Sequence, residues 1–206
     1  MSLADSRARR EGPARGRPRS EAVERSIIEG VMKLLEDGVP LADLSMERVA
    51  RTAGVGKATI YRRWRGKEEL FVDVLRAAEP ADPELPGTSM RDDLVVMLES
   101  LRQRGLLARS SAILHNVYAQ MKSSPQIWAA YHATVVEPRR RLGAEVLRRG
   151  QENGELRADL DIDFVNDLFV GPMLVRTVLR PDGDLPEELA EQIVDALLTG
   201  LRPTGP

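Results

Sequence analysis

The sequence has 206 residues, of which 42% are hydrophobic, enough to build the core of one large or two small domains. It contains no cysteine, which excludes disulfides and thiolate metal sites, and no apolar run of the ~18 to 20 residues that a membrane span needs. The formal net charge of −2 is unevenly distributed, with 16 Lys or Arg against 12 Asp or Glu in residues 1–78 and 14 against 20 in the rest. This division favours an N-terminal part that meets nucleic acid, although solvated Arg-rich helices would give a similar count. Because no signal peptide is evident, we expect a cytoplasmic protein with no membrane partner.

Residues 1–19 are predicted to form a disordered basic arm, because six arginines are interspersed with glycine and proline. The end of this arm, Arg15-Gly16-Arg17-Pro18-Arg19, resembles the core of an AT-hook. A Gly-Arg-Pro unit keeps the chain extended and narrow enough to enter an A·T-rich minor groove, whose potential attracts arginine. Arg15, Arg17 and Arg19 are therefore candidate DNA contacts. The alternative is a basic tail that attracts phosphates without reading sequence.

Residues 20–78 are predicted to form a helical domain. Ser20 is suited to cap its first helix. The apolar stripe of this helix consists of Val23, Ile27, Val31, Leu34 and Leu35. Ser45 can cap a second helix, and Gly66 separates a third helix from a fourth that runs from Lys67 to Ala78.

The segment from Leu44 to Leu70 has the spacing of two short helices that cross at a glycine turn, which is a helix-turn-helix. Gly54 permits the bend, while Ile60 and Trp64 occupy one face of the second helix at i, i+4 spacing. The opposite face is left to Lys57, Thr59, Tyr61, Arg62 and Arg63. From position 49 to position 67 there are six basic residues and no acidic one, the charge pattern of a surface that contacts phosphates. The sequence therefore predicts binding to double-stranded DNA.

A change of composition at residues 79–89, with three prolines and a glycine, marks a linker before a second domain over residues 90–203. Helical periodicity recurs around 94–101 and 113–121, and over 124–153, 162–179 and 186–201. Pro138 is expected to kink the longest of these segments. Since no sustained period-two alternation is present, the predicted fold class is all-α with about nine helices: an N-terminal three-helix helix-turn-helix domain and a C-terminal helical domain.

The last predicted helix carries an unbroken i, i+4 stripe of apolar residues. With the helix before it, this stripe could form half of an intermolecular four-helix bundle. The candidate dimer interface consists of Phe164, Leu168, Val175, Leu185, Leu189, Ile193, Leu197 and Leu201. The same periodicity is compatible with packing of both helices inside one subunit. The need of a helix-turn-helix for two half-sites favours a homodimer.

Nothing in the sequence indicates a catalytic, metal or cofactor site. His115 and His132 are the only histidines, and neither lies at metal-ligand spacing from a carboxylate or from the other. There is no nucleophile elbow, P-loop or glycine-rich dinucleotide turn. A helical enzyme or carrier acting through the second domain would lack residues for its chemistry, so we expect neither enzymatic activity nor a metal or cofactor.

The order of these features resembles the TetR family of bacterial transcriptional regulators. The resemblance is specific over Glu21–Leu75, where LSMERVARTAGV is similar to the second helix and turn, and KATIYRRWRGKEEL to the recognition helix running into the fourth. It implies contacts to the DNA backbone by Ser45, Lys57, Thr59, Tyr61 and Lys67. It also implies that Ala58, Arg62 and Arg63 lie at or near base edges. The family usually has serine or a similar polar residue where Gly56 stands, so one side-chain cap and phosphate contact is expected to be missing.

Beyond residue 80 the resemblance is one of length, helical content and helix order, and it implies an internal cavity for a ligand. The candidate effector-binding residues are Met97, Leu101, Leu114, Tyr118, Met121, Trp128, Tyr131, His132, Phe169 and Met173. Soft methionines, large rings and few polar tips suit a small, mainly apolar effector. The plainer interpretation is that these residues form ordinary core.

The resemblance as a whole implies a homodimeric, ligand-responsive regulator, in the leading hypothesis a repressor, that binds a pseudo-palindromic operator. The alternative is an architectural DNA binder that prefers A·T-rich sequence and has no small-molecule switch. One strong palindromic site would distinguish the first function from the second.

Overall fold

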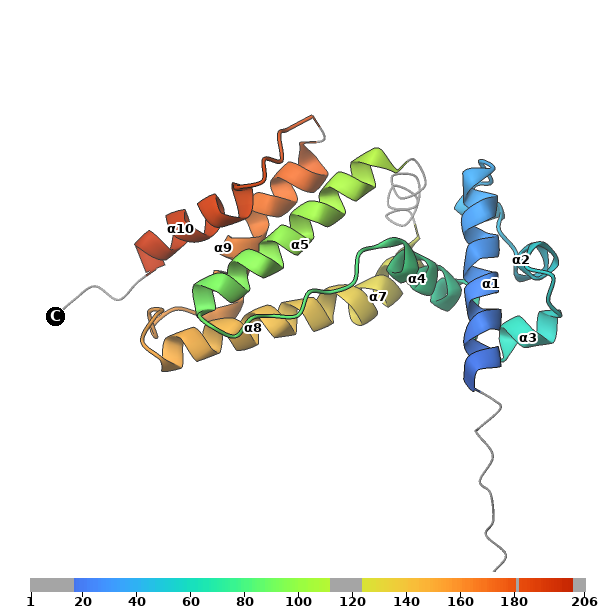
Figure 1. The fold of residues 1–206 in the computed structure, drawn as a ribbon, viewed down its shortest axis with the longest axis horizontal. Helices are drawn as coiled ribbons and strands as arrows, with labels where there is room; N and C mark the ends of the chain where they lie inside the picture. Colours follow the sequence, from blue (N-terminus) through green and yellow to red (C-terminus); the bar gives the residue numbers. More distant parts are fainter. Residues whose placement is uncertain (1–16, 112–123, 181, 202–206) are drawn as a thin grey trace, which may run out of the picture.

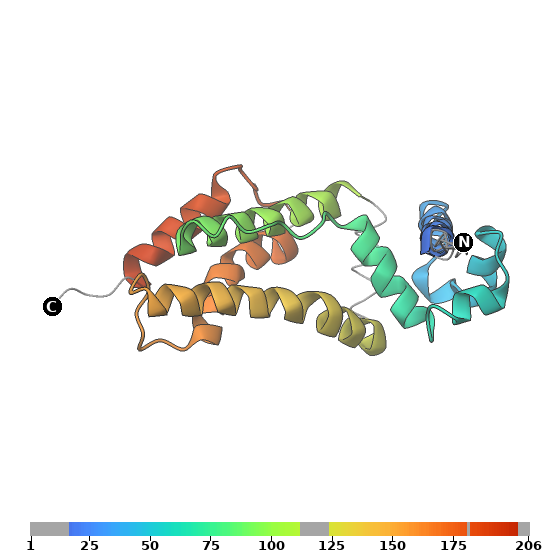
Figure 2. The same cartoon turned by 60° about the horizontal axis from the view of Figure 1, so that its bottom comes forward.

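The computed structural model describes residues 17–111, 124–180 and 182–201, without the side chains of residues 17–19. Within these ranges every regular element is helical, as predicted. The helices form two parts at opposite ends of an elongated molecule (Figure 1, Figure 2). We call residues 17–78 the head and the described part of residues 90–201 the body.

The head contains the predicted helix-turn-helix. Its elements are α1 (Arg17–Glu36), the 3-10 turn η1 (Leu41–Asp43), α2 (Met46–Thr52), α3 (Lys57–Tyr61) and α4 (Lys67–Ala78). The hydroxyl of Ser45 caps α2 by accepting a hydrogen bond from the backbone N–H of Arg48 at 3.2 Å. The bend between α2 and α3 falls at Gly54, whose φ of 66° lies in the left-handed region that favours glycine.

The start of α1 differs from the prediction. The helix begins at Arg17 rather than at Ser20, so the backbone of Arg17-Pro18-Arg19 is helical and not extended. Proline is tolerated in a first turn because its missing N–H would have no partner there. Arg15 lies outside the described residues, as do the side chains of Arg17 and Arg19, and contact of the arm with DNA stays a prediction.

The apolar core of the head continues into the body. Ile27 of α1 and Ile60 of α3 are fully buried, and α4 packs against α1 on one side. On its other side α4 contacts the first helix after the 112–123 gap, so that Ile127, Tyr131 and Val135 belong to the same buried cluster as the head. The two parts of the molecule therefore share a core across α4.

The body is a layered bundle of long helices (Figure 2). Its elements are α5 (Met90–Ser110), α7 (Pro125–Tyr131), the π-helical turn η2 (His132–Val136), α8 (Glu137–Glu152), α9 (Ile162–Leu174), the π-helical turn η3 (Val175–Leu179) and α10 (Leu189–Leu201). The helix expected around 113–121 lies outside the described residues. The segment expected over 124–153 is present as α7, η2 and α8 in direct succession, and the disruption caused by Pro138 takes the form of the wide turn η2 just before it.

A second core holds α5, α8, α9 and α10 together. Phe169 and Met173 of α9 are buried there with Leu147 of α8. At Gly143 of α8, a Cβ atom would lie 2.6 Å from Oδ1 of Asn166, so the glycine permits close approach of α9. None of the helices in the described ranges combines the length and the apolarity needed to cross a membrane.

Candidate nucleic-acid interface

The orientation of α3 is set by two buried side chains. Ile60 is fully buried, and Trp64, three residues after the end of α3, is 3% exposed. The indole Nε1 of Trp64 donates a hydrogen bond to Oδ2 of Asp73 on α4 at 2.8 Å. These contacts fix the inner face of α3 against the head, so that its opposite face points to solvent.

The predicted DNA-contacting residues are mostly accessible on this outer side. Those that are exposed are Ser45, Lys57, Ala58, Tyr61, Arg62 and Lys67. Thr59 is half-buried. The ammonium of Lys57 lies 5.6 Å from the centre of the Tyr61 ring, a cation–π geometry that keeps the two groups together at the start and end of α3.

The sequence pattern did not include one acidic residue that lies on this surface, because that residue precedes the basic segment 49–67 by two positions. Glu47, in the first turn of α2, forms an ion pair with Lys57 across the gap between α2 and α3. The hydrogen bond from Lys57 lowers the pKa of Glu47, and the same bond raises the pKa of Lys57, so both groups are charged at neutral pH. The Glu47 carboxylate is therefore paired with Lys57, which the family resemblance implies to be a phosphate contact.

Replacement of Glu47 by glutamine should therefore tighten binding to duplex DNA of any sequence. With Lys57 released to a phosphate, the slope of log affinity against log salt should steepen by about 0.9 per added contact. Fluorescence anisotropy with a non-operator duplex at several salt concentrations measures both quantities. Asp159→Asn, which breaks the exposed Arg157–Asp159 pair at the far end of the body, is the matched control and should change neither. An unaltered slope for Glu47→Gln would contradict the assignment of Lys57 to a phosphate.

Arg63 is half-buried and its guanidinium is bonded within the head, so its predicted place at base edges stays a prediction. Its Nη1 donates to the backbone carbonyl of Thr59 at 3.2 Å. Its Nη2 donates to the carbonyl and to the hydroxyl of Ser20 on α1, at 3.2 and 3.1 Å. The guanidinium therefore ties the C-terminal end of α3 to α1, a contact that favours a positioning role for Arg63.

The candidate effector-binding residues divide between the two cores. Tyr131 is buried in the head core, and His132 is exposed. The ring centre of Trp128 lies 6.3 Å from that of Tyr131 and 6.3 Å from that of His132. Trp128 itself is 43% exposed. The others described here, Met97, Leu101, Phe169 and Met173, pack in or against the body core. Leu114, Tyr118 and Met121 lie outside the described residues, so the gathering of the ten around one site stays a prediction.

The predicted dimer interface on α10 is mostly buried within its own subunit, and its part in dimerisation stays a prediction. Because α10 packs against α5 and α9 of its own subunit, most of its apolar stripe has little surface left for a partner. The buried members are Leu185, Leu189, Ile193 and Leu201, and Leu197 is half-buried.

The predicted α9 residues remain accessible and extend further than expected. Phe164 is 54% exposed and Val175 42% exposed, with Leu168 half-buried between them. Val178 and Leu179, which the sequence interpretation missed although Val178 continues the helical spacing from Val175, are 49% and 71% exposed. We call these five residues the α9 face.

The C-terminal end of the α9 face is held by α5. Arg109 donates hydrogen bonds to the carbonyls of Arg176 and Gly183, both at 2.6 Å, and to that of Arg180 at 3.0 Å. These bonds tie the carbonyl of Arg176 in η3, and those of two residues that follow η3, to α5. The exposed apolar residues of η3 therefore lie on a fixed backbone.

Sequence profiles of known families cover both parts of the chain. One described as "Tetracyclin repressor-like, C-terminal domain" matches residues 86–197, more than half of the chain. A second, described as "Bacterial regulatory proteins, tetR family", matches residues 27–74. The chain belongs to the TetR family. The second match begins in α1 and ends in α4, so the TetR assignment of the head agrees with the helix-turn-helix seen in the structure.

Relatives described as transcriptional regulators match this chain over most of its length. The HTH-type transcriptional regulator YdeS of Bacillus subtilis is 29% identical over 170 residues, which cover 82% of this chain and 84% of that protein. The DNA-binding transcriptional repressor TetR of Mycobacteroides abscessus is 28% identical over 193 residues, covering 92% and 97%. This chain is accordingly a transcriptional regulator of the TetR family, a family whose members act by binding DNA.

Solved structures show the same architecture. The TetR family transcription regulator SCO0332 is 26% identical and superposes with a TM-score of 0.58, covering 88% of this chain and 99% of that one. The repressor MexZ of Pseudomonas aeruginosa, at 19% identity, shares the fold with a TM-score of 0.61 over 89% and 96% of the two chains.

The departure from the usual TetR pattern at Gly56 is visible in the structure. Gly56 is the N-cap of α3 and supplies no side-chain hydrogen bond to the helix. A Cβ atom there would meet only Oγ1 of Thr59, at 3.9 Å, so a serine would fit. The missing cap therefore reflects the residue and not a lack of space.

Proposed function

We propose that this TetR-family protein is a homodimeric repressor that binds a pseudo-palindromic operator and releases it when a small, mainly apolar effector binds to the body. The observation that carries the DNA-binding part is the anchored α3: its inner face is fixed by Ile60 and Trp64, and its outer face presents Lys57, Tyr61 and Arg62. Repression is the activity named for the relative from Mycobacteroides abscessus.

The roles on the DNA follow from the position of each side chain. Arg62 is exposed directly after α3 and is the candidate for bidentate hydrogen bonds to guanine. Lys57, Tyr61 and Lys67 flank it and would contact phosphates, together with Ser45 at the N-terminus of α2 and the half-buried Thr59. Ala58, exposed in the first turn of α3, is small enough to lie against base edges.

Dimerisation through the α9 face would place two heads on one duplex. An exposed patch of five apolar residues is unfavourable in water, and the α9 face of a second copy would bury it in a symmetric interface. Two recognition helices then address half-sites about 34 to 36 Å apart, or further along the duplex. Selection of duplexes from a random pool tests this part of the proposal, and paired half-sites bound by a dimer are the expected result.

An effector in the body should be detectable through Trp128. Its indole is 43% exposed and lies beside Tyr131, so a ligand that settles there should shift or quench its fluorescence. The same compound should raise the melting temperature by mass action and weaken operator binding. A thermal-shift screen of small apolar compounds, followed by a gel shift with each stabilising compound, provides the measurement.

Two variants distinguish residues that bind an effector from residues that form the core. Trp128→Ala removes a half-exposed ring and should abolish the response while leaving the fold intact. Phe169→Ala should instead destabilise the protein by ~3 to 5 kcal/mol, because that side chain is 1% exposed in the body core. If no compound stabilises the wild type, the effector-responsive part of the proposal is refuted.

A further inference from the structure

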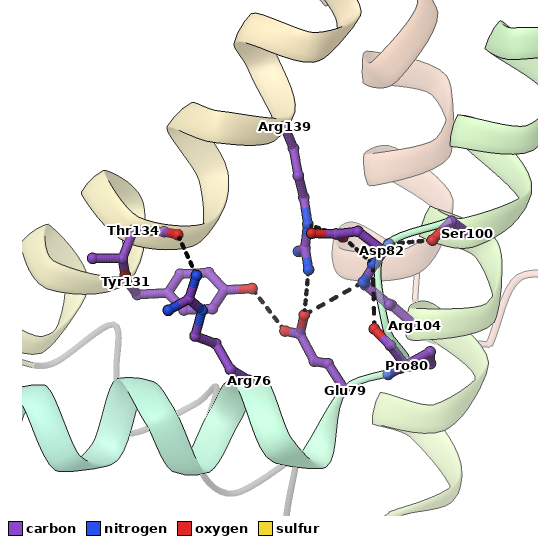
Figure 3. A network of polar contacts seen from close by, with 9 residues as sticks. All are labelled: Arg76, Glu79, Pro80, Asp82, Ser100, Arg104, Tyr131, Thr134 and Arg139. Atoms are coloured by element: carbon purple, nitrogen blue, oxygen red, sulfur yellow. Dashed lines mark hydrogen bonds and ion pairs between the residues drawn. The ribbon is translucent and has the colours of Figure 1, made fainter. Parts of the chain in front are cut away.

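A buried carboxylate follows α4 at the junction of head and body (Figure 3). The side chain of Glu79, the first residue after α4, is 2% exposed. Its Oε1 accepts a hydrogen bond from the hydroxyl of Tyr131 on α7 at 2.8 Å, and its Oε2 accepts one from Nη2 of Arg139 on α8 at 2.9 Å. Nε of Arg104 on α5 lies 3.4 Å from the same Oε2. One side chain thus joins the end of the head to three helices of the body.

A second carboxylate balances the charges of this group. Asp82 in the linker accepts hydrogen bonds from Nη2 of Arg104 at 2.5 Å and from Nε of Arg139 at 2.8 Å. Two arginines are thereby matched by two carboxylates, with Tyr131 as a further donor. We call these five residues the Glu79 cluster. Because an unpaired buried charge is far less stable than a paired one, the cluster favours a single arrangement over a range of intermediate ones.

A second contact from α4 reaches the same part of the body. Nη2 of Arg76 donates to the backbone carbonyl of Thr134 at 3.4 Å, as Figure 3 shows. In a regular α-helix this carbonyl would accept from the N–H of residue 138, but residue 138 is a proline and has none. The carbonyl of Thr134 in η2 therefore lacks the hydrogen bond from residue i+4 and is available to Arg76 of α4.

The helix that carries these partners crosses from one core to the other. Tyr131 and Val135, before Pro138, are buried in the head core, while Val146 and Leu147 of α8 are buried in the body core. The wide turn η2, which follows Tyr131 and contains Val135, interrupts the α-helical hydrogen bonds before α8 begins. The Glu79 cluster lies at this crossing, where a small change in the direction of α4 would be amplified at α3.

We propose that Glu79 is a positioning residue that fixes the direction of the head on the body and so determines which half-site spacing the dimer accepts. Tyr131 is the donor through which α7 holds it. This inference rests on the proposed dimeric binding of an operator. A head held in one direction accepts one spacing of half-sites, whereas a head released from Glu79 accepts neighbouring spacings as well.

The test uses full-length protein and the operator that the wild type selects from random duplex DNA. Affinity is measured for this operator, for versions with one base pair inserted or removed between the half-sites, and for a single half-site as the normalising duplex. The wild type should lose about 5- to 150-fold on the altered spacings. Glu79→Gln, which keeps the shape and removes the charge, and Tyr131→Phe, which removes one hydroxyl, should each reduce that loss by at least about fivefold.

The control is an arginine–carboxylate pair within the body. Asp195→Asn removes the charge and one of the two oxygens that accept hydrogen bonds from Arg91, at 2.7 and 2.9 Å. These bonds join α5 to α10 without touching α4. The variant should leave the spacing penalty at the wild-type value. If Glu79→Gln does not fold, Tyr131→Phe decides the matter. The inference would be overturned if the Glu79 and Tyr131 variants kept the wild-type loss of affinity on altered spacings, or if Asp195→Asn reduced that loss equally. Failure of the wild type to select any paired site would overturn the proposed function together with the inference.

Discussion

Replacement of Val175 and Val178 by glutamate is expected to convert the proposed dimer into folded monomers. Both side chains are exposed, at 42% and 49%, so two charges there leave the subunit core intact. In a dimer they would be buried against the partner's like charges, at a cost that no contact in an apolar interface offsets. Loss of the second head removes the benefit of linked half-sites, and operator affinity should fall by about 10²- to 10⁴-fold. Sedimentation at micromolar concentration and a gel shift measure the two effects.

Ile193→Glu distinguishes this interface from the one first predicted on α10. Ile193 belongs to the core of its own subunit, so a charge there should unfold the body instead of giving monomers. Circular dichroism separates the two outcomes. Dimers that persist in the Val175→Glu, Val178→Glu variant would contradict the assignment of the α9 face.

Replacement of Arg62 by alanine is expected to weaken the discrimination between operator and other DNA. If Arg62 binds guanine through two hydrogen bonds, the loss should be ~1 to 3 kcal/mol on the operator and much smaller on non-operator duplex. Tyr61→Phe, which removes only a hydroxyl assigned to phosphate, should weaken binding to both duplexes equally. Competition gel shifts with the two duplexes give the ratio directly. An equal loss on both for Arg62→Ala would exclude it from base recognition.

Arg63→Ala is the matched control on the neighbouring residue. Since its guanidinium binds Ser20 and the carbonyl of Thr59, its removal should lower the melting temperature of the head. The ratio of operator to non-operator affinity should be retained, provided the comparison is made well below the melting temperature. Two adjacent arginines are thus expected to show opposite phenotypes.

The helix-turn-helix could be predicted from the sequence because its determinants are local. The Ser45 cap, the left-handed Gly54 and the buried pair of Ile60 and Trp64 all lie within one short segment, where periodicity and turn chemistry suffice. The all-α class and the interruption near Pro138 follow from the same kind of signal. In these elements each residue type has one role that its neighbours in the sequence already imply.

The features that could not be predicted depend on residues far apart in the chain. Arg63 binds Ser20, 43 positions away, and Tyr131 binds Glu79, 52 positions away. No local pattern shows that these side chains are already committed to partners within the subunit. The apolar stripe of α10 illustrates a related limit of sequence patterns: helical spacing predicts that a face is buried, but not whether the subunit or a partner covers it.

Enrichment of duplexes from a random pool by the purified full-length protein, followed by sedimentation of the complex, is the most direct test of the account. We predict one dominant pseudo-palindromic site that is bound by a dimer, with affinity that depends on both half-sites. Enrichment of unpaired A·T-rich duplexes alone, bound by a monomer, would contradict dimeric operator recognition and support the architectural alternative.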